Sequence, residues 1–136
     1  MLASNKIFQF LILFCCLIFT SCFEKMDSEN NIIYQTRDYE GIRNAILFIK
    51  SSGATVGDSY QISILPSQNK LSNSDVGNIF VSDDPNRALN SDTSMIKLMW
   101  VGHDTLRITY NKKLRVFKSI TKTSDAIIVY DTTTLK

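Results

Sequence analysis

The sequence predicts a mostly β domain, folded as an antiparallel β-sandwich or a strongly curved sheet of about six strands. Three observations lead to this fold class. Short apolar runs rich in β-branched and aromatic side chains recur after residue 44, and several alternate polar and apolar residues with a period of two. Glycine, proline, asparagine, aspartate and serine gather between the runs, as they do in turns. At 136 residues the chain suits one such domain.

The first 21 residues are typical of a secretory signal peptide. Lys6 precedes residues 7–19, an apolar stretch in which Gln9 is the one polar side chain. A positive charge followed by such a run forms the n-region and h-region of a signal. A membrane-spanning helix needs about 20 apolar residues, and this run is shorter and is soon followed by Glu24 and Lys25. We therefore expect a cleaved signal rather than a permanent span.

The end of this segment, Phe19-Thr20-Ser21-Cys22, resembles the lipobox of bacterial lipoproteins. In that class an apolar residue and two small residues precede an obligatory cysteine, although leucine is more usual than the phenylalanine found at Phe19. No alanine occurs between Leu11 and Asn44, so an Ala-x-Ala cleavage site is missing. The resemblance implies that Cys22 carries a diacylglyceryl group, becomes the acylated mature N-terminus and anchors the chain on a membrane, since two or more acyl chains hold a protein stably.

Cleavage before Cys22 leaves an exported chain without a free thiol or a disulfide. Cys15 and Cys16 leave with the signal, and Cys22 is consumed by the lipid. The remaining chain keeps 14 of the 15 basic residues against 13 acidic ones, because only Lys6 is removed. This near-neutral balance predicts no nucleic-acid partner. The expected partners are the membrane, through Cys22, and an envelope protein.

The segment 22–36 is interpreted as the lipidated N-terminus and a tether, because residues 24–31 are densely polar and charged. Its last part, Ile32-Ile33-Tyr34, equally fits the start of a first strand, since a short apolar run alone does not fix the element type. With the tether interpretation, the β-rich exported domain covers residues 37–136.

The run Ala45–Ile49 is interpreted as a strand, with a helix over 37–50 as the competing interpretation because three isoleucines lie there at helical spacing. We prefer the strand because the next run, 60–65, alternates cleanly and ends at Pro66. The glycines of segment 51–58 suit a hairpin between the two.

The clearest hairpin joins 96–100 to 106–110 through Gly102-His103-Asp104. Apolar side chains alternate with polar ones on both arms, as a half-buried antiparallel pair requires. We predict that the aromatic residues on such strands are core residues. These are Tyr60, Trp100, Tyr110 and Tyr130. Three further short strands are expected at 78–82, 115–117 and 126–130.

His103 is the only histidine, and Asp104 beside it suggests an acid–base pair. Its place at an exposed hairpin tip favours a plain turn, so we predict no catalytic residue here. With one histidine and no free cysteine, we expect no zinc or copper site and no cofactor. Residues 83–86, with Asp92 nearby, carry oxygen ligands suited to calcium but lack a calcium-loop pattern, so a turn is predicted.

A small basic cluster follows the second arm of the hairpin. It comprises Lys112, Lys113, Arg115, Lys118 and Lys122. We interpret it as a solvated strand edge, where lysine discourages aggregation. Attraction to anionic lipid headgroups is the alternative interpretation.

Several segments together resemble a family of small bacterial lipoproteins and exported domains of unknown function. They are Gly53–Thr55, Ser59–Pro66, Gly77–Val81, Trp100 and Leu106–Tyr110. The similarity covers most of residues 45–130 and its motifs are structural in character. It implies β structure over 45–65, and no catalytic or binding residue is carried over from it.

These observations lead us to expect a lipid-anchored envelope protein that faces the periplasm or the cell exterior and serves as a non-enzymatic binding, scaffold or accessory module. The sequence holds no Gly-x-Ser-x-Gly elbow and no glycine-rich phosphate loop. The enzymatic alternative is an envelope hydrolase that pairs carboxylates among Asp83, Asp84 and Asp104. An inhibitor or immunity lipoprotein fits the sequence as well as the first interpretation does.

Overall fold

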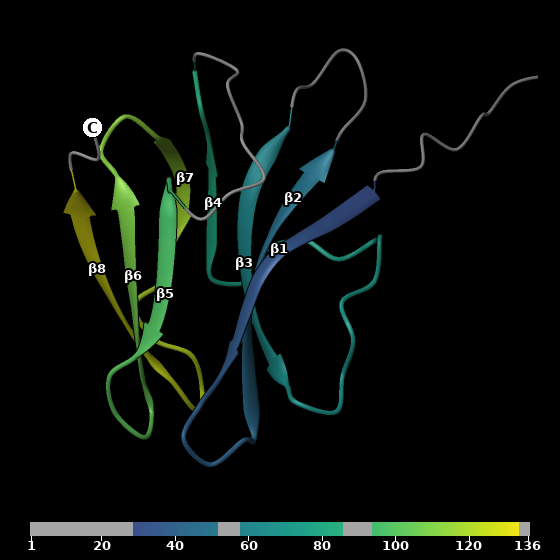
Figure 1. Ribbon diagram of the computed structural model, residues 1–136, viewed down its shortest axis with the longest axis vertical. Helices are drawn as coiled ribbons and strands as arrows, with labels where there is room; N and C mark the ends of the chain where they lie inside the picture. The colour runs from purple at the N-terminus through teal and green to yellow at the C-terminus, as the bar shows by residue number, and fades with distance from the viewer. Residues whose placement is uncertain (1–28, 52–57, 86–93, 134–136) are drawn as a thin grey trace, which may run out of the picture.

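The computed structural model describes residues 29–51, 58–85 and 94–133, which form eight β-strands in two sheets (Figure 1). The larger sheet has the order β1-β2-β3-β4-β7, and the smaller has the order β5-β6-β8. The strands are β1 (Glu29–Arg37), β2 (Arg43–Ser51), β3 (Ser59–Pro66), β4 (Phe80–Asp83), β5 (Ile96–Trp100), β6 (Thr105–Asn111), β7 (Arg115–Ser119) and β8 (Ile127–Thr133). Within these ranges, no helix is long and apolar enough to cross a bilayer.

The predicted β fold class is confirmed, and so is the strand preferred for Ala45–Ile49 over the competing helix of 37–50. The run Ala45–Ile49 lies inside β2, which pairs antiparallel with β1 on one side and with β3 on the other. Both faces of β2 are buried from Arg43 to Ile49, so its apolar run is continuous and mimics helical spacing. The hairpin connection expected at 51–58 lies mostly outside the described residues.

The first strand begins at Glu29, so most of the segment interpreted as a tether belongs to the sheet. The sequence left two interpretations open for Ile32–Tyr34, a strand or part of the tether. The structure places these residues in strand β1. A bulge between Ile32 and Tyr34 shifts the register with β2, and Ile33 packs against the core. The signal peptide and Cys22 lie outside the described residues.

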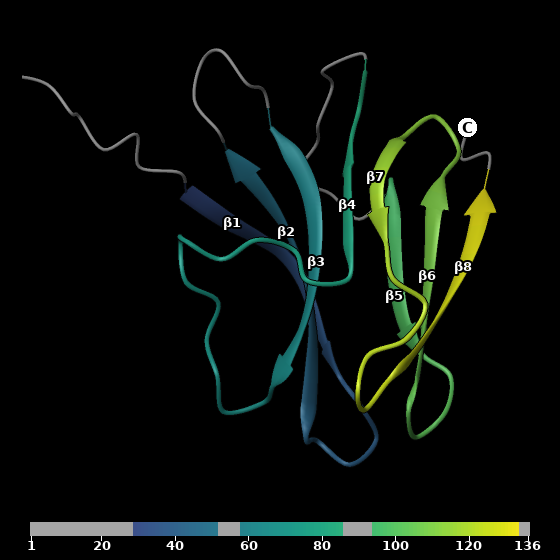
Figure 2. The same ribbon diagram turned by 180° about the vertical axis from the view of Figure 1, so that it is seen from behind.

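The predicted hairpin of 96–100 and 106–110 is confirmed as β5 and β6, with Trp100 opposite Leu106. One pair departs from the antiparallel pattern, because β8 runs parallel to β6. Parallel neighbours need a crossover connection. Here β7 provides it by pairing with β4 in the larger sheet, and the view from behind shows β7 in front of β5 (Figure 2).

The main core lies between the two sheets and includes the aromatic residues expected there. Tyr60 and Trp100 are buried, and Tyr110 and Tyr130 pack against the core while partly exposed. The rings of Tyr110 and Tyr130 lie 5.3 Å and 5.9 Å from that of Phe80, measured between centroids. Offset aromatic contacts of this kind add to the stabilisation from buried area.

A second buried layer lies on the outer face of the larger sheet. Ile46 and Phe48 are buried but point away from the main core, as alternation along β2 requires. The connection 67–79 lies against this face. Its carbonyl groups accept hydrogen bonds from the side chains of Asn30 and Lys50. This connection explains how a sheet can be buried on both sides without a helix.

Candidate interaction surface

Three connections between strands meet at one end of the molecule, at the bottom of Figure 1. They are 38–42, between β1 and β2, 101–104, between β5 and β6, and 123–126, before β8. We call these residues the loop end. They lie at the opposite end of β1 from Glu29. A strand of nine residues spans about 26 Å at 3.3 Å per residue, so the loop end is far from the point where the described chain begins.

The sequence Asp38-Tyr39-Glu40-Gly41 builds the first of these turns. Aspartate at the first position and glycine at the fourth are typical of a tight turn. The Gly41 amide donates to the Asp38 carbonyl over 3.1 Å, and Gly41 adopts a φ of 71° that only glycine adopts at low cost. One carboxylate oxygen of Asp38 accepts from the amides of Ile42 and Arg43 at 2.9 Å and 3.3 Å. The aspartate therefore fixes the turn from both its backbone and its side chain.

The buried side chain of Arg43 connects all three parts of the loop end. Its Nε donates to Asp38 Oδ2 over 2.7 Å. Its two terminal nitrogens donate to the backbone carbonyls of Asp125 and His103, and the guanidinium lies 5.2 Å from the ring centroid of Trp100. A guanidinium is suited to this position because its donors form a rigid planar fork. The Arg43 side chain thus joins the two sheets at this end, and the Trp100 indole adds a second link by donating to the Thr36 carbonyl over 3.2 Å.

Asp38 and Arg43 form an ion pair away from water, since the Asp38 side chain is fully buried and that of Arg43 is 11% exposed. Burial by itself raises the pKa of the Asp38 carboxyl. The hydrogen bonds from the Arg43 side chain, the Arg43 amide and the Ile42 amide outweigh this effect, so the pKa of Asp38 is lowered overall. The carboxylate is therefore charged at neutral pH and holds Arg43 in place.

The outer surface of the loop end carries apolar side chains that this framework keeps fixed. Tyr39 is 71% exposed and Ile42 is 58% exposed, and Val101 is also exposed. The Tyr39 hydroxyl donates to the Trp100 carbonyl over 3.4 Å, at the edge of the smaller sheet. Large exposed apolar side chains on a rigid end are typical of a protein-binding surface.

His103 lies at the tip of the β5–β6 hairpin, as predicted, and its side chain is 82% exposed. Its neighbour is Glu40, whose Oε1 lies 3.4 Å from His103 Nδ1. Asp104 does not orient the imidazole, because its carboxylate accepts a hydrogen bond from the Thr105 hydroxyl. The acid–base pair suggested by adjacent residues therefore does not form.

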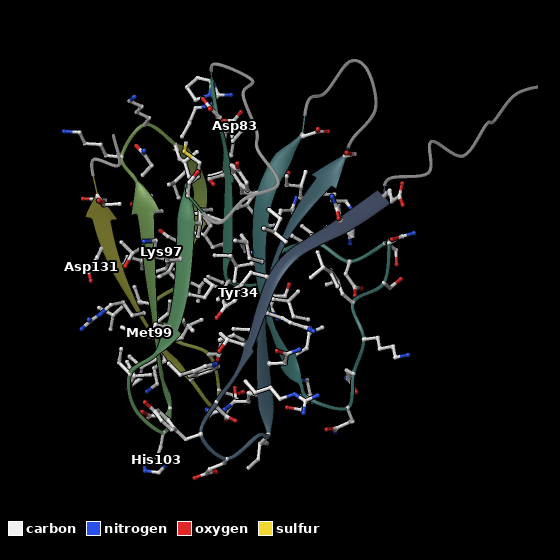
Figure 3. The ribbon with its side chains drawn as sticks, viewed as in Figure 1. Tyr34, Asp83, Lys97, Met99, His103 and Asp131 are labelled. Carbon is white, nitrogen blue, oxygen red and sulfur yellow. The ribbon has the colours of Figure 1, made fainter. Side chains whose placement is uncertain are left out.

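The three carboxylates considered for a hydrolase do not come together, because Asp104 lies apart from Asp83 and Asp84. Asp83, on β4, accepts hydrogen bonds from Arg115 on β7, at 3.0 Å and 2.5 Å. Asp84 follows it and is buried, whereas Asp104 belongs to the loop end. Figure 3 shows Asp83 and His103, the residue before Asp104, at opposite ends of the molecule. Glycoside hydrolysis needs two carboxyl groups within about 10 Å, so this arrangement counts against a pair that includes Asp104. Asp83 and Asp84 are neighbours in sequence, but the Asp83 carboxylate is already bound by Arg115.

No metal site forms among the residues that the structure describes. These residues contain no group of three or more histidine, cysteine, aspartate or glutamate side chains able to hold an ion. Asn86 and Asp92, considered as calcium ligands with Asp83 and Asp84, lie outside the described ranges.

The basic cluster after β6 is divided among separate contacts. Arg115 pairs with Asp83, and this contact raises the pKa of the guanidinium. Lys118 donates to the Gly77 carbonyl over 3.0 Å, whereas Lys112, Lys113 and Lys122 are exposed. Two of the five charges therefore have structural roles.

Sequence reasoning did not identify Asp38 and Arg43. The signal that was available is the Asp-x-x-Gly pattern of 38–41, which predicts the turn. The remaining partners of Arg43 are backbone carbonyls of Asp125 and His103, 82 and 60 positions further along the chain. No local pattern predicts such contacts.

Comparisons of this chain with protein-family models, with curated proteins and with solved structures find no match. The resemblance to small bacterial lipoproteins therefore stays an expectation from the sequence.

Proposed function

We propose that this protein is a lipid-anchored, non-enzymatic binding module of the bacterial cell envelope that presents the loop end to a partner protein. The observation that carries the proposal is the buried contact of Arg43 with Asp38, Asp125 and His103. It fixes three connections from two sheets beneath an exposed surface that includes Tyr39 and Ile42.

The cost of burying charges supports a role for this arrangement. Well-packed apolar residues often stabilise a fold as well as a buried ion pair does. The contribution of a buried ion pair that also satisfies hydrogen-bonding groups of the surrounding loops is different, because it specifies a single conformation of those loops. Fixing loops before binding lowers the entropy lost on association. A module that recognises a partner gains affinity when its loops are fixed before binding, whereas a connection with no binding role does not need a fixed conformation.

The expected anchor point is consistent with this orientation. The chain between Cys22 and Glu29 can extend at most about 25 Å, and Glu29 begins β1 at the end away from the loop end. An acyl anchor at Cys22 would keep the start of β1 near the bilayer. The loop end would then face away from the membrane, toward a partner.

The anchor is tested by the intact mass of the protein made in a bacterial host, with and without the Cys22→Ala substitution. We expect a chain that begins at Cys22 and carries added acyl mass, and we expect that species to be lost in the variant. A chain cleaved elsewhere, or left without acyl mass, would contradict the anchor.

The binding surface is tested by placing a photocrosslinking amino acid at Tyr39 or Ile42 in cells. A matched control carries the same amino acid at Val76, which is 56% exposed but lies on the connection 67–79. We expect a discrete crosslinked product from the two loop-end positions and none from the control. Equal crosslinking from all three positions, or none from any, would contradict the loop end as the binding surface.

A further inference from the structure

The backbone of β8 exposes hydrogen-bonding groups on the side away from β6. The Ile127 amide donates to the Asp104 carbonyl, and the Lys112 amide donates to the Thr133 carbonyl. Odd-numbered residues of β8 therefore bond to β6, as the parallel register from Thr105–Ile127 onward requires. The amide and carbonyl groups of even-numbered residues point to the opposite edge.

This outer edge is open over a defined length. Ile128 is covered, because its amide donates to the Thr121 carbonyl over 2.8 Å. In the described part of the chain, β8 is the last strand of its sheet, so no strand pairs with Tyr130 and Thr132 on this side. The Tyr130 hydroxyl lies 2.8 Å from the Ile120 carbonyl and 3.2 Å from the Ile79 carbonyl. The open edge is thus held rigidly against the core.

The outer face of the sheet beside this edge is partly apolar. Val129 and Ile127 of β8 are exposed there, and Met99 of β5 lies two strands away, with Arg107 of β6 between it and Val129. Asp131 lies between the open groups of Tyr130 and Thr132, and its side chain is 54% exposed and 3.4 Å from Arg107 Nε. Figure 3 shows Asp131, Lys97 and Met99 on the smaller sheet.

Asp131 makes self-pairing through this edge unfavourable. Two copies can pair antiparallel through this edge, with Tyr130 of each copy hydrogen-bonded to Thr132 of the other. In that register, Asp131 of one copy lies directly opposite Asp131 of the second copy. Facing residues at such a position have Cα atoms only about 4.5 Å apart, and like charges directly opposite each other destabilise a sheet. The same geometry favours a strand that carries a cation opposite Asp131.

We propose that the open edge of β8 is a strand-addition site for an extended segment of a partner protein, with lysine or arginine opposite Asp131 and an apolar residue opposite Val129. Backbone bonds to Tyr130 and Thr132 supply the pairing, and the two side chains supply selectivity, as in other cases of β-augmentation. This site lies apart from Tyr39 and Ile42 and does not depend on the lipid anchor.

The test uses a second copy of the full chain, with Asp131→Lys and Thr133→Val, as a probe strand that places the proposed charge opposite Asp131 and an apolar residue opposite Val129. Isotope-labelled wild-type protein in detergent is titrated with the unlabelled variant, and backbone amide shifts are recorded. We expect shifts in residues 127–133 of the mixture and no self-association of either protein alone. The variant alone places lysine opposite lysine, which is also repulsive. Absence of shifts in the mixture, or self-association of wild type through this edge, would overturn the proposal.

A second substitution tests whether the backbone of this edge makes the pairing. Thr132→Pro removes an amide that faces away from β6, so the bonds between β6 and β8 stay intact. The Thr132→Pro substitution is introduced into the labelled protein. We expect it to abolish the backbone amide shifts of residues 127–133, and we expect the thermal unfolding curve to stay close to that of the wild type. Shifts that persist in this variant would show that the proteins associate elsewhere, and would overturn the proposal.

Discussion

Arg43 and Asp38 are five residues apart, and their side chains meet beneath the turn that lies between them, with Arg43 Nε 2.7 Å from Asp38 Oδ2. The ion pair does more than close this turn, because the remaining donors of Arg43 reach carbonyl groups of the other connections at the loop end. The larger sheet supplies both charges, and the His103 carbonyl belongs to a hairpin of the smaller sheet. The contact therefore couples the two layers where they approach solvent.

The first prediction concerns the Arg43→Met variant, which keeps the length of the side chain and loses its charge. We expect it to lower the free energy of unfolding by about 3 kcal/mol, because the buried Asp38 carboxylate loses its counter-ion. Denaturant unfolding at pH 7 measures the change. Arg37→Met is the matched control, since Arg37 is exposed at the end of β1. A loss as small as that of the control would show that the pair is not effectively buried.

The pH dependence of stability gives a second prediction. The pKa of Asp38 is lower in the folded protein than its ordinary value near 3.8. The folded state therefore favours the charged form, and this contribution is present above the ordinary pKa and is lost as pH falls below it. Asp38→Asn should destabilise the protein at pH 7, and the difference from wild type should shrink between pH 4 and pH 2. Unfolding curves across this range check the prediction, and a constant difference would contradict it.

The parts of the fold that local pattern decides were predictable, and those that depend on distant contacts were not. Alternation in β5 and β6 predicted both arms of their hairpin, because one face of each is solvated. The apolar run of β2 is continuous because both faces of the strand are buried, one of them under the connection 67–79. Such a run does not alternate, so the sequence alone fitted a helix as well as a strand. The polar start of β1 resembled a tether for a related reason, since most of its side chains are exposed and its pairing with β2 is set by the backbone.

Tyr130 gives a third prediction, because its burial stabilises the neutral form of the phenol. Burial raises its pKa to about 12. Since an unfolded tyrosine ionises near pH 10, stability should fall as pH rises from 10 to 12. Tyr130→Phe should lose about 1 kcal/mol at pH 7, the typical contribution of one hydrogen bond. The variant should also show a weaker decline above pH 10. Phenolate absorbance and unfolding measured at the same pH values test both parts, and an unchanged alkaline decline would contradict the assignment to Tyr130.

Two glycines should respond differently to alanine, which gives a fourth prediction. A Cβ at Gly77 would lie 2.5 Å from the Phe80 carbonyl oxygen and 3.1 Å from the Ile62 amide nitrogen, both backbone atoms. A Cβ at Gly41 meets nothing within 4 Å, but its φ of 71° is strained for alanine. We expect Gly77→Ala to cost about 3 kcal/mol through overpacking and Gly41→Ala to cost about 1 kcal/mol. Thermal unfolding of the two variants gives the ranking, and the reverse order would contradict the close packing at Gly77.

The last prediction concerns Lys50, which fixes the connection 67–79 over the outer face of the larger sheet. Its ammonium group donates to the carbonyls of Asn73 and Asp75 at 3.0 Å and 2.9 Å. Lys50→Met keeps the aliphatic stem and removes these charged hydrogen bonds, so we expect a loss of about 2 kcal/mol.

Hydrogen exchange identifies where this loss occurs. The amides of Asp75 and Gly77, which bond to Ser72 and Gln61, should exchange faster in the variant, whereas those of β6 and β8 should not. Lys97→Met is the control, because Lys97 is exposed on β5. Because Phe48 lies buried on the covered face, loosening of the connection should also expose apolar surface and increase the binding of a hydrophobic dye. Unchanged exchange at Asp75 and Gly77 would show that the connection is held by its other contacts, those of Asn30 among them.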